Sequence, residues 1–163
     1  MKVYLAHSIA TTAEKKDSIR VANEIRKLGF EVYAAAENNT INDKSNNPHP
    51  REIYEADFKE LSSSDILVIN LNGSLQDGTI LELGITKGLN ESHWESHGKT
   101  RIPIIAYSSN ERVLEPQFYE GVASASLGHM GLGGVDKWGV FAKTETNMLE
   151  TLKGIKAGVI SFD

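Results

Sequence analysis

An apolar run in the middle of the chain, Asp65-Ile66-Leu67-Val68-Ile69-Asn70-Leu71, constrains the fold more than any other feature. Its apolar residues are continuous rather than alternating, which is typical of a strand that is buried on both faces. Strands of this kind belong to parallel sheets with helices packed on both sides. The run therefore predicts an α/β protein.

Strand and helix patterns alternate along the rest of the chain. Further strands are expected at 3–6, 30–34, 101–107 and 138–142, and helices at 11–28, from 50, around Glu82 and at 146–155. Short connections between alternating strands and helices favour a doubly wound sheet. We predict a single α/β domain over residues 1–163, with a five-stranded parallel sheet in the flavodoxin-like order 2-1-3-4-5 and helices on both faces.

Signals at the helix ends support these boundaries. Thr11 and Glu14 have the spacing of a capping box, and Gly29 can end the first helix. Pro50 can open the second helix, which carries Tyr54, Phe58 and Leu61 on one predicted apolar face.

Three polar or glycine-rich segments are expected to lack regular structure. Residues 37–50 resemble a long loop that serves a site, and residues 90–100 a polar insertion. Gly128 to Gly134 is predicted to be a flap. His93 and His97 have the spacing of a metal-binding pair, but no third ligand is evident, so no metal site and no cofactor are predicted.

Composition excludes several classes of function. The chain has no cysteine, which excludes thiol catalysis and suits the reducing cytoplasm, our expected location. Its 22 acidic and 17 basic residues give a net charge of -5, the wrong sign for binding nucleic acid. No apolar run approaches the roughly 20 residues of a membrane span. We therefore expect neither nucleic acid nor membrane as a partner.

The predicted sheet also locates the site. Ligands of such sheets bind at the carboxyl ends of the strands, where the strand order reverses. That point lies here between the first and third strands. Residues 4–8 and 70–82 should therefore meet.

Glu82 is the candidate nucleophile of this site. It follows Asp77 by five residues, at the start of a helix in which Leu81, Leu83 and Ile85 should exclude water. A desolvated but ionised carboxylate is a good nucleophile towards a sugar carbon. The alternative is structural, because Thr79 and Glu82 also have capping-box spacing.

The other candidates have structural alternatives too. Asp57 lies beside the apolar face of its helix and can equally be a solvated charge. Asp77 precedes a glycine, as in many turns, and Tyr4 can simply be a core residue. Ser8 and the threonines after it can bind a phosphate or cap the first helix.

Together these motifs resemble the nucleoside 2-deoxyribosyltransferase family. The likeness rests on Val3-Tyr4-Leu5-Ala6, on Asp57 eight residues before Asp65-Ile66-Leu67-Val68, and on Asp77-Gly78-Thr79 leading to Glu82-Leu83-Gly84. It covers roughly residues 2 to 107. The Asp-Gly-Thr-x-x-Glu-x-Gly element is its most specific part.

The resemblance implies a role for each residue. Glu82 would attack C1′ of a 2′-deoxynucleoside, and a free nucleobase would then take the deoxyribosyl group. Asp57 would help to protonate the leaving base, Asp77 would bind the sugar and Tyr4 would orient Glu82. The resemblance also implies a homo-oligomer, a dimer or higher. The remaining expected substrate-binding residues are Ala6, Ser8, Asn72 and Gly78.

Two alternatives stay open. Related family members hydrolyse deoxyribonucleoside 5′-monophosphates and bind the phosphate through serines of the first loop, a role for which Ser8 and Ser74 are candidates. A non-catalytic nucleotide-binding module with the same fold is the other.

Overall fold

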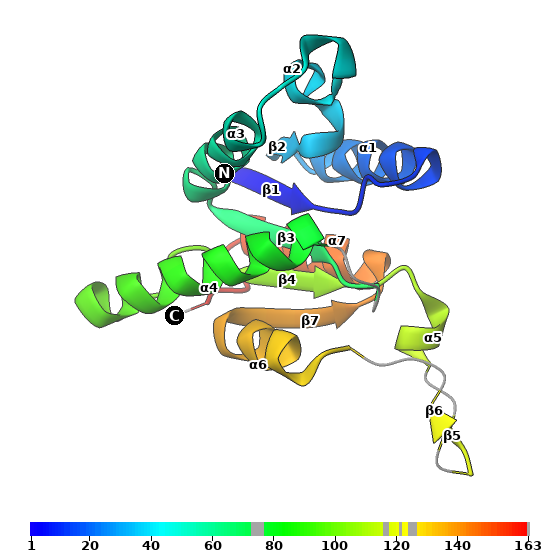
Figure 1. The fold of residues 1–163 in the computed structure, drawn as a ribbon. Coiled ribbons are helices and arrows are strands. Elements are labelled where there is room, and N and C mark those ends of the chain that lie inside the picture. The colour runs from blue at the N-terminus through cyan, green and yellow to red at the C-terminus, as the bar shows by residue number, and fades with distance from the viewer. Residues whose placement is uncertain (73–76, 116–117, 121, 124–126, 163) are drawn as a thin grey trace.

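The sheet has the predicted architecture. A computed structural model describes residues 1–72, 77–115, 118–120, 122–123 and 127–162. Its main sheet contains five strands, all parallel, in the order β2-β1-β3-β4-β7 (Figure 1). The predicted order 2-1-3-4-5 is confirmed. The strands are β1 (Lys2–Ala6), β2 (Glu31–Ala34), β3 (Ile66–Asn70), β4 (Ile104–Tyr107) and β7 (Gly139–Lys143).

Seven helices are described: α1 (Thr12–Lys27), α2 (Asn39–Asn42), α3 (Pro50–Ser62), α4 (Asp77–His97), α5 (Glu111–Leu114), α6 (His129–Trp138) and α7 (Glu145–Lys156). Single 3-10 turns, Ala35–Glu37 and Lys44–Asn46, flank α2, and a short antiparallel pair, β5 (Phe118–Tyr119) and β6 (Val122–Ala123), follows α5. Among the described helices, none is long and apolar enough to cross a membrane.

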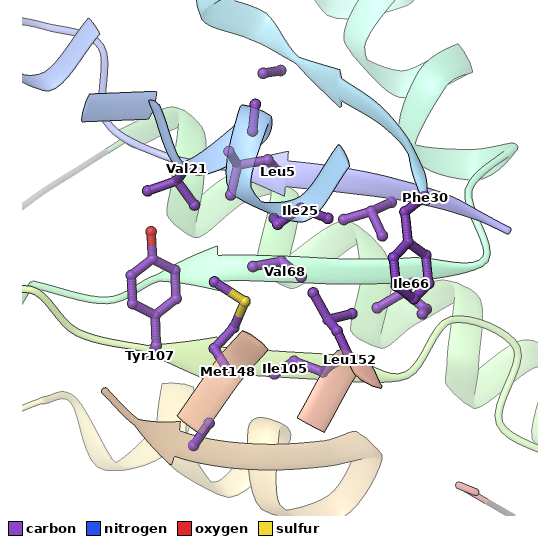
Figure 2. Close-up of a cluster of buried hydrophobic side chains, with 14 residues drawn as sticks. Leu5, Val21, Ile25, Phe30, Ile66, Val68, Ile105, Tyr107, Met148 and Leu152 are labelled. Carbon is purple, nitrogen blue, oxygen red and sulfur yellow. The ribbon is translucent and has the colours of Figure 1, made fainter. Parts of the chain in front are cut away.

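The two faces of the sheet bury separate hydrophobic clusters. Leu5, Val68 and Ile105 point towards α1 and α7, where Val21, Ile25, Met148 and Leu152 meet them (Figure 2). The intervening strand residues pack on the opposite face against Leu61 of α3, Leu83 of α4 and Trp138 of α6. Every residue of β3 is buried, as its continuous apolar run predicts.

The predicted helix signals are present in the structure. The Thr11 side chain accepts the backbone N–H of Glu14 at 3.2 Å, and the Glu14 carboxylate accepts the N–H of Thr11 at 2.8 Å. Gly29 follows the helix with φ +81°, a conformation that favours glycine. Pro50 opens α3 behind its cap, His49.

The polar insertion predicted at 90–100 is wrong, because α4 continues to His97. Asn90 is fully buried, and its side chain satisfies both backbone groups of Ile102. It donates to the carbonyl of Ile102 and accepts the N–H of Ile102, both at 2.8 Å. The last turns of α4 face solvent, so their polar sequence looks like that of a loop.

The flap predicted at Gly128–Gly134 is also wrong, because most of this segment lies in α6. A Cβ at Gly131 would make an ordinary contact with Leu83 of α4 at 3.9 Å, and the flexible stem of Lys87 occupies the place of a Cβ at Gly134. The helix is anchored by Val135 and Trp138, which are buried.

Two further expectations need correction. The loop predicted at 37–50 contains α2 and a 3-10 turn. Of the predicted apolar face of α3, only Leu61 is buried; Tyr54 and Phe58 are 48% and 37% exposed and stack on each other with ring centroids 5.9 Å apart. Helical spacing placed these rings on one face, but it could not tell whether that face meets the core.

Candidate active site

The first part of the candidate site joins β1 to α4. Tyr4 is fully buried at the centre of β1, and its hydroxyl donates a hydrogen bond of 2.6 Å to Oε1 of Glu82. Glu82 lies in the second turn of α4, on the side that faces the sheet. Tyr4 thus holds the carboxylate of Glu82 and leaves Oε2 free of that bond.

A second, similar pair lies beside the first. Parallel pairing sets Tyr33 of β2 opposite Tyr4, with ring centroids 5.2 Å apart. The Tyr33 hydroxyl donates to Oδ1 of Asp57 in α3 at 2.7 Å and accepts from Nδ2 of Asn38 at 3.1 Å. Two adjacent strands therefore each present a tyrosine hydroxyl to one carboxylate.

The electrostatics of both carboxylates follow from burial. Desolvation raises the pKa of Glu82 to about 7; the hydrogen bond from Tyr4 lowers it, and the nearby charge of Asp57 raises it. Desolvation likewise raises the pKa of Asp57, against the hydrogen bond from Tyr33, while Glu60 raises it further. Burial raises the pKa of Tyr4, which stays a donor. Within the described residues, no cation pairs with either carboxylate.

The source of this burial differs from the prediction. Leu81 is 54% exposed and cannot shield Glu82, whereas Leu83 is buried. The sheet side, with Tyr4 at its centre, covers the carboxylate instead. The structural alternative for Glu82, a capping box with Thr79, does not apply. The helix α4 begins at Asp77, so Thr79 is its third residue rather than its N-cap.

The β1 loop is occupied by its own contacts. Ala6 and Ser8 are buried, and His7 Nδ1 donates to the carbonyl of Ser8 at 2.7 Å. The carboxylate of Glu14 accepts from both the N–H and the hydroxyl of Thr11, at 2.8 and 2.9 Å. Hydrogen bonds from Ser8 and then Thr11 lower the pKa of Glu14, so a fixed negative charge stands at this loop.

The other predicted site residues lie apart from the Tyr4–Glu82 and Tyr33–Asp57 pairs or outside the described residues. Asn72 bonds to the turn after β4, accepting from Ser108 Oγ at 3.0 Å and from the N–H of Ser109 at 2.9 Å. Gly78 is exposed in the first turn of α4. The side chain of Asp77 and the whole of Ser74 lie outside the described residues.

In the part of the chain that the structure describes, no three potential metal-binding side chains gather. The rings of His93 and His97 stack at 4.1 Å on the exposed end of α4.

Sequence reasoning missed Tyr33 and Asn38. For Tyr33 no local signal was sufficient, because its place beside Tyr4 depends on the register of the two parallel strands. For Asn38 the signal was weaker, since nothing in the polar segment after β2 distinguishes it from the neighbouring asparagine.

The structure is therefore an α/β protein with two adjacent carboxylates, each bound by a tyrosine hydroxyl. Comparison with known families places it more narrowly. The sequence profile of nucleoside 2-deoxyribosyltransferases matches residues 3–150, and the chain belongs to that family. No curated protein matches the sequence.

Three solved structures share the fold. A conserved protein from Enterococcus faecalis V583 is 23% identical with a TM-score of 0.78, covering 95% of this chain and 98% of its own. A 2-deoxyribosyltransferase from Bacillus psychrosaccharolyticus is 20% identical with a TM-score of 0.53, over 68% and 74%. A CMP N-glycosidase from Clostridium botulinum is 13% identical with a TM-score of 0.53, over 93% and 97%.

Proposed function

We propose that this protein transfers the 2-deoxyribosyl group between nucleobases through a covalent intermediate on Glu82. The observation that carries the proposal is the partly buried carboxylate of Glu82, held at 2.6 Å by the Tyr4 hydroxyl beside a second carboxylate, Asp57. One group can act as nucleophile and the other as proton carrier, the two roles that cleavage of an N-glycosidic bond requires.

In the first step, Oε2 of ionised Glu82 bonds to C1′ of the deoxynucleoside as the bond from C1′ to the base nitrogen breaks. The electron pair of that bond stays on the base, which takes a proton from Asp57. In the second step a different base attacks C1′, returns a proton to Asp57 and releases Glu82. Atoms and charge therefore balance without a cofactor.

Hydrolysis of deoxynucleoside 5′-monophosphates is the alternative, and the β1 loop argues against it. A phosphate carries about -1.5 to -2 charges and needs free amides or cations. The Glu14 carboxylate already holds the Thr11 amide and adds a negative charge. We therefore expect kcat/KM to be higher for deoxyadenosine than for its monophosphate; the reverse order, lowered selectively by Ser8→Ala, would support the hydrolase.

The deciding experiment is isotope exchange between free bases and the four deoxynucleosides, with intact mass measured under substrate. We expect exchange and a mass increase of one deoxyribosyl group, both lost in Glu82→Ala. Glu91→Ala is the matched control, because Glu91 lies exposed on the same helix and pairs with Lys137. Hydrolysis of monophosphates alone would favour the alternative, and no reaction at all would favour a nucleotide-binding module.

We also propose a homo-oligomer, a dimer or higher. The support is the family membership together with exposed apolar side chains on α3 and at the start of α4: Tyr54, Phe58, Ile80 and Leu81. Sedimentation should show a species larger than the 17.9 kDa chain at assay concentrations. A fully active monomer would contradict this.

A further inference from the structure

We propose that Tyr33, held by Asn38, is a positioning residue for proton transfer to and from the base: it fixes Oδ1 of Asp57 as a hydrogen-bond acceptor, so that the proton is carried on Oδ2. The inference rests on the proposed function and adds to it two residues from β2 and the segment after it.

The direction of the hydrogen bonds carries the argument. Asn38 Nδ2 can only donate, so its 3.1 Å contact uses a lone pair of the Tyr33 oxygen. The hydroxyl hydrogen of Tyr33 then points to the remaining partner, Oδ1 of Asp57, at 2.7 Å. A carboxylate whose Oδ1 accepts this bond takes up its proton on the other oxygen.

Asn38 is itself held in place. Its backbone N–H donates to the carbonyl of Ala35 at 3.1 Å, and its carbonyl accepts the N–H of Asn42 at 3.0 Å. The preceding Glu37 pairs with Arg26 of α1, which also donates to the carbonyl of Val32 at 3.0 Å. The segment after β2 is therefore anchored to the sheet and to α1, and it transmits that rigidity to the Tyr33 hydroxyl.

The surroundings give Tyr33 a measurable effect on Asp57. The titratable groups near Asp57 are Tyr33 from β2, Glu60 from α3, and Glu82 and Tyr4 from α4 and β1. Of these, Tyr33 alone donates a hydrogen bond to Asp57 in the described residues. Its loss should raise the pKa of Asp57, because the charged form loses a donor.

The test compares Tyr33→Phe with Tyr107→Phe. Tyr107 is the control because it is also a tyrosine of the sheet but is buried on the other face. Its hydroxyl has no hydrogen-bond partner among the described residues. Each variant is assayed on two substrates of one base type, deoxyguanosine and 7-methyldeoxyguanosine, or deoxyuridine and its 5-trifluoromethyl derivative. The base of 7-methyldeoxyguanosine already carries a positive charge, so it leaves as a neutral base without protonation. The trifluoromethyl group stabilises the pyrimidine anion, so this base also leaves with little need of a proton.

We expect Tyr33→Phe to lower kcat about 10-fold on the ordinary substrate and less than about 2-fold on the activated one. Asn38→Ala should show the same selectivity with a smaller loss, and the exposed neighbour variant Asn39→Ala no loss. Equal losses on both substrates would mean that Tyr33 only supports the fold, and would overturn the inference.

A second measurement does not depend on activity. Carbon NMR of the carboxyl groups should show that Tyr33→Phe raises the pKa of Asp57, whereas Tyr107→Phe leaves it unchanged. An unchanged pKa overturns the inference even if the enzyme transfers deoxyribose. If the wild type shows no transfer but the pKa moves, the proposed function fails while the positioning of Asp57 stands.

Discussion

Two pairs of acidic side chains, one on each side of the sheet, are held in opposite ways. On the α1 side, Arg20 donates to Glu145 at 2.8 and 2.6 Å and to Asp17 at 2.9 Å, so both acids have a cation partner. On the α4 side, Glu82 and Asp57 receive hydrogen bonds from tyrosine hydroxyls, which bring no charge. Partner chemistry thus distinguishes the two pairs: a cation meets the charge of one pair, and only a hydroxyl dipole meets the other.

The consequence is visible in the protonation equilibria. A guanidinium stabilises an ionised carboxylate and fixes its charge. A hydroxyl compensates only part of the desolvation, so the pKa of Glu82 rises to about 7 and that of Asp57 also rises. The carboxylate of Glu82 can therefore gain and lose a proton near neutral pH.

Removing the nucleophile should have the largest effect. We expect Glu82→Gln to lower kcat at least about 1,000-fold, roughly 4 kcal/mol in the barrier, because an amide cannot form the ester with C1′. The circular dichroism spectrum should stay that of the wild type. Retention of more than about a tenth of kcat, equivalent to less than ~1.4 kcal/mol, would exclude the covalent mechanism.

Asp57→Asn should rank second. Loss of a general acid costs typically 100-fold or more, about 2.7 kcal/mol, and we expect a loss near that value on substrates with poor leaving groups. Steady-state kinetics on the substrate pairs described above measure it. Asp136 of α6 is exposed, so Asp136→Asn is the matched control and should behave as wild type. A uniform loss across both leaving groups would assign Asp57 to binding instead.

The fold was predictable because its signals are local and redundant. The β3 run, the Thr11–Glu14 box and Gly29 each act within a few residues, and alternating strands and helices favour a parallel doubly wound sheet. The errors fall where tertiary contacts decide. The polar side chain of Asn90 is buried because it bonds to both backbone groups of Ile102, and α6 is helical despite its glycines, with Val135 and Trp138 buried.

For the candidate site, residue types could be predicted but pairings could not. Glu82, Asp57 and Tyr4 were identified by motif, and the structure brings them together. The partner of Asp57 depends on the register between β1 and β2, which no short motif encodes. The covering of Glu82 likewise depends on which face of α4 meets the sheet, and this is why Leu81 was wrongly expected to shield it.

The desolvated carboxylate of Glu82 should lower the stability of the folded protein at high pH. The pKa of Glu82 is about 7 in the folded protein against its ordinary 4.5, so the folded state binds its proton more tightly. The contribution of protonated Glu82 to the free energy of unfolding is therefore fully present below pH about 4.5, and it is lost as the pH rises towards 7. Glu82→Gln removes this loss and should be about 2 kcal/mol more stable than wild type at pH 8.

Thermal unfolding of both proteins at pH 5 and pH 8 checks the third prediction. The advantage of Glu82→Gln should be several degrees at pH 8 and much smaller at pH 5. An advantage that does not change with pH would mean that the carboxylate is not desolvated.

The smallest effect is expected on the opposite face, from Arg20→Ala. The Arg20 side chain is 50% exposed, so solvent screens its ion pairs with Asp17 and Glu145. We expect a loss of about 0.5–1 kcal/mol, or 1–4 °C in Tm, that shrinks at high salt. The exposed pair of Lys153 and Glu150 supplies the control Lys153→Ala, which should change Tm less, because it breaks one short-range pair within α7. Transfer activity of Arg20→Ala should stay within about 2-fold of wild type, since removing the cation partner of Asp17 and Glu145 on one face should not disturb Glu82 and Asp57 on the other. A 10-fold loss of kcat would show instead that the two faces are energetically coupled through the buried strands.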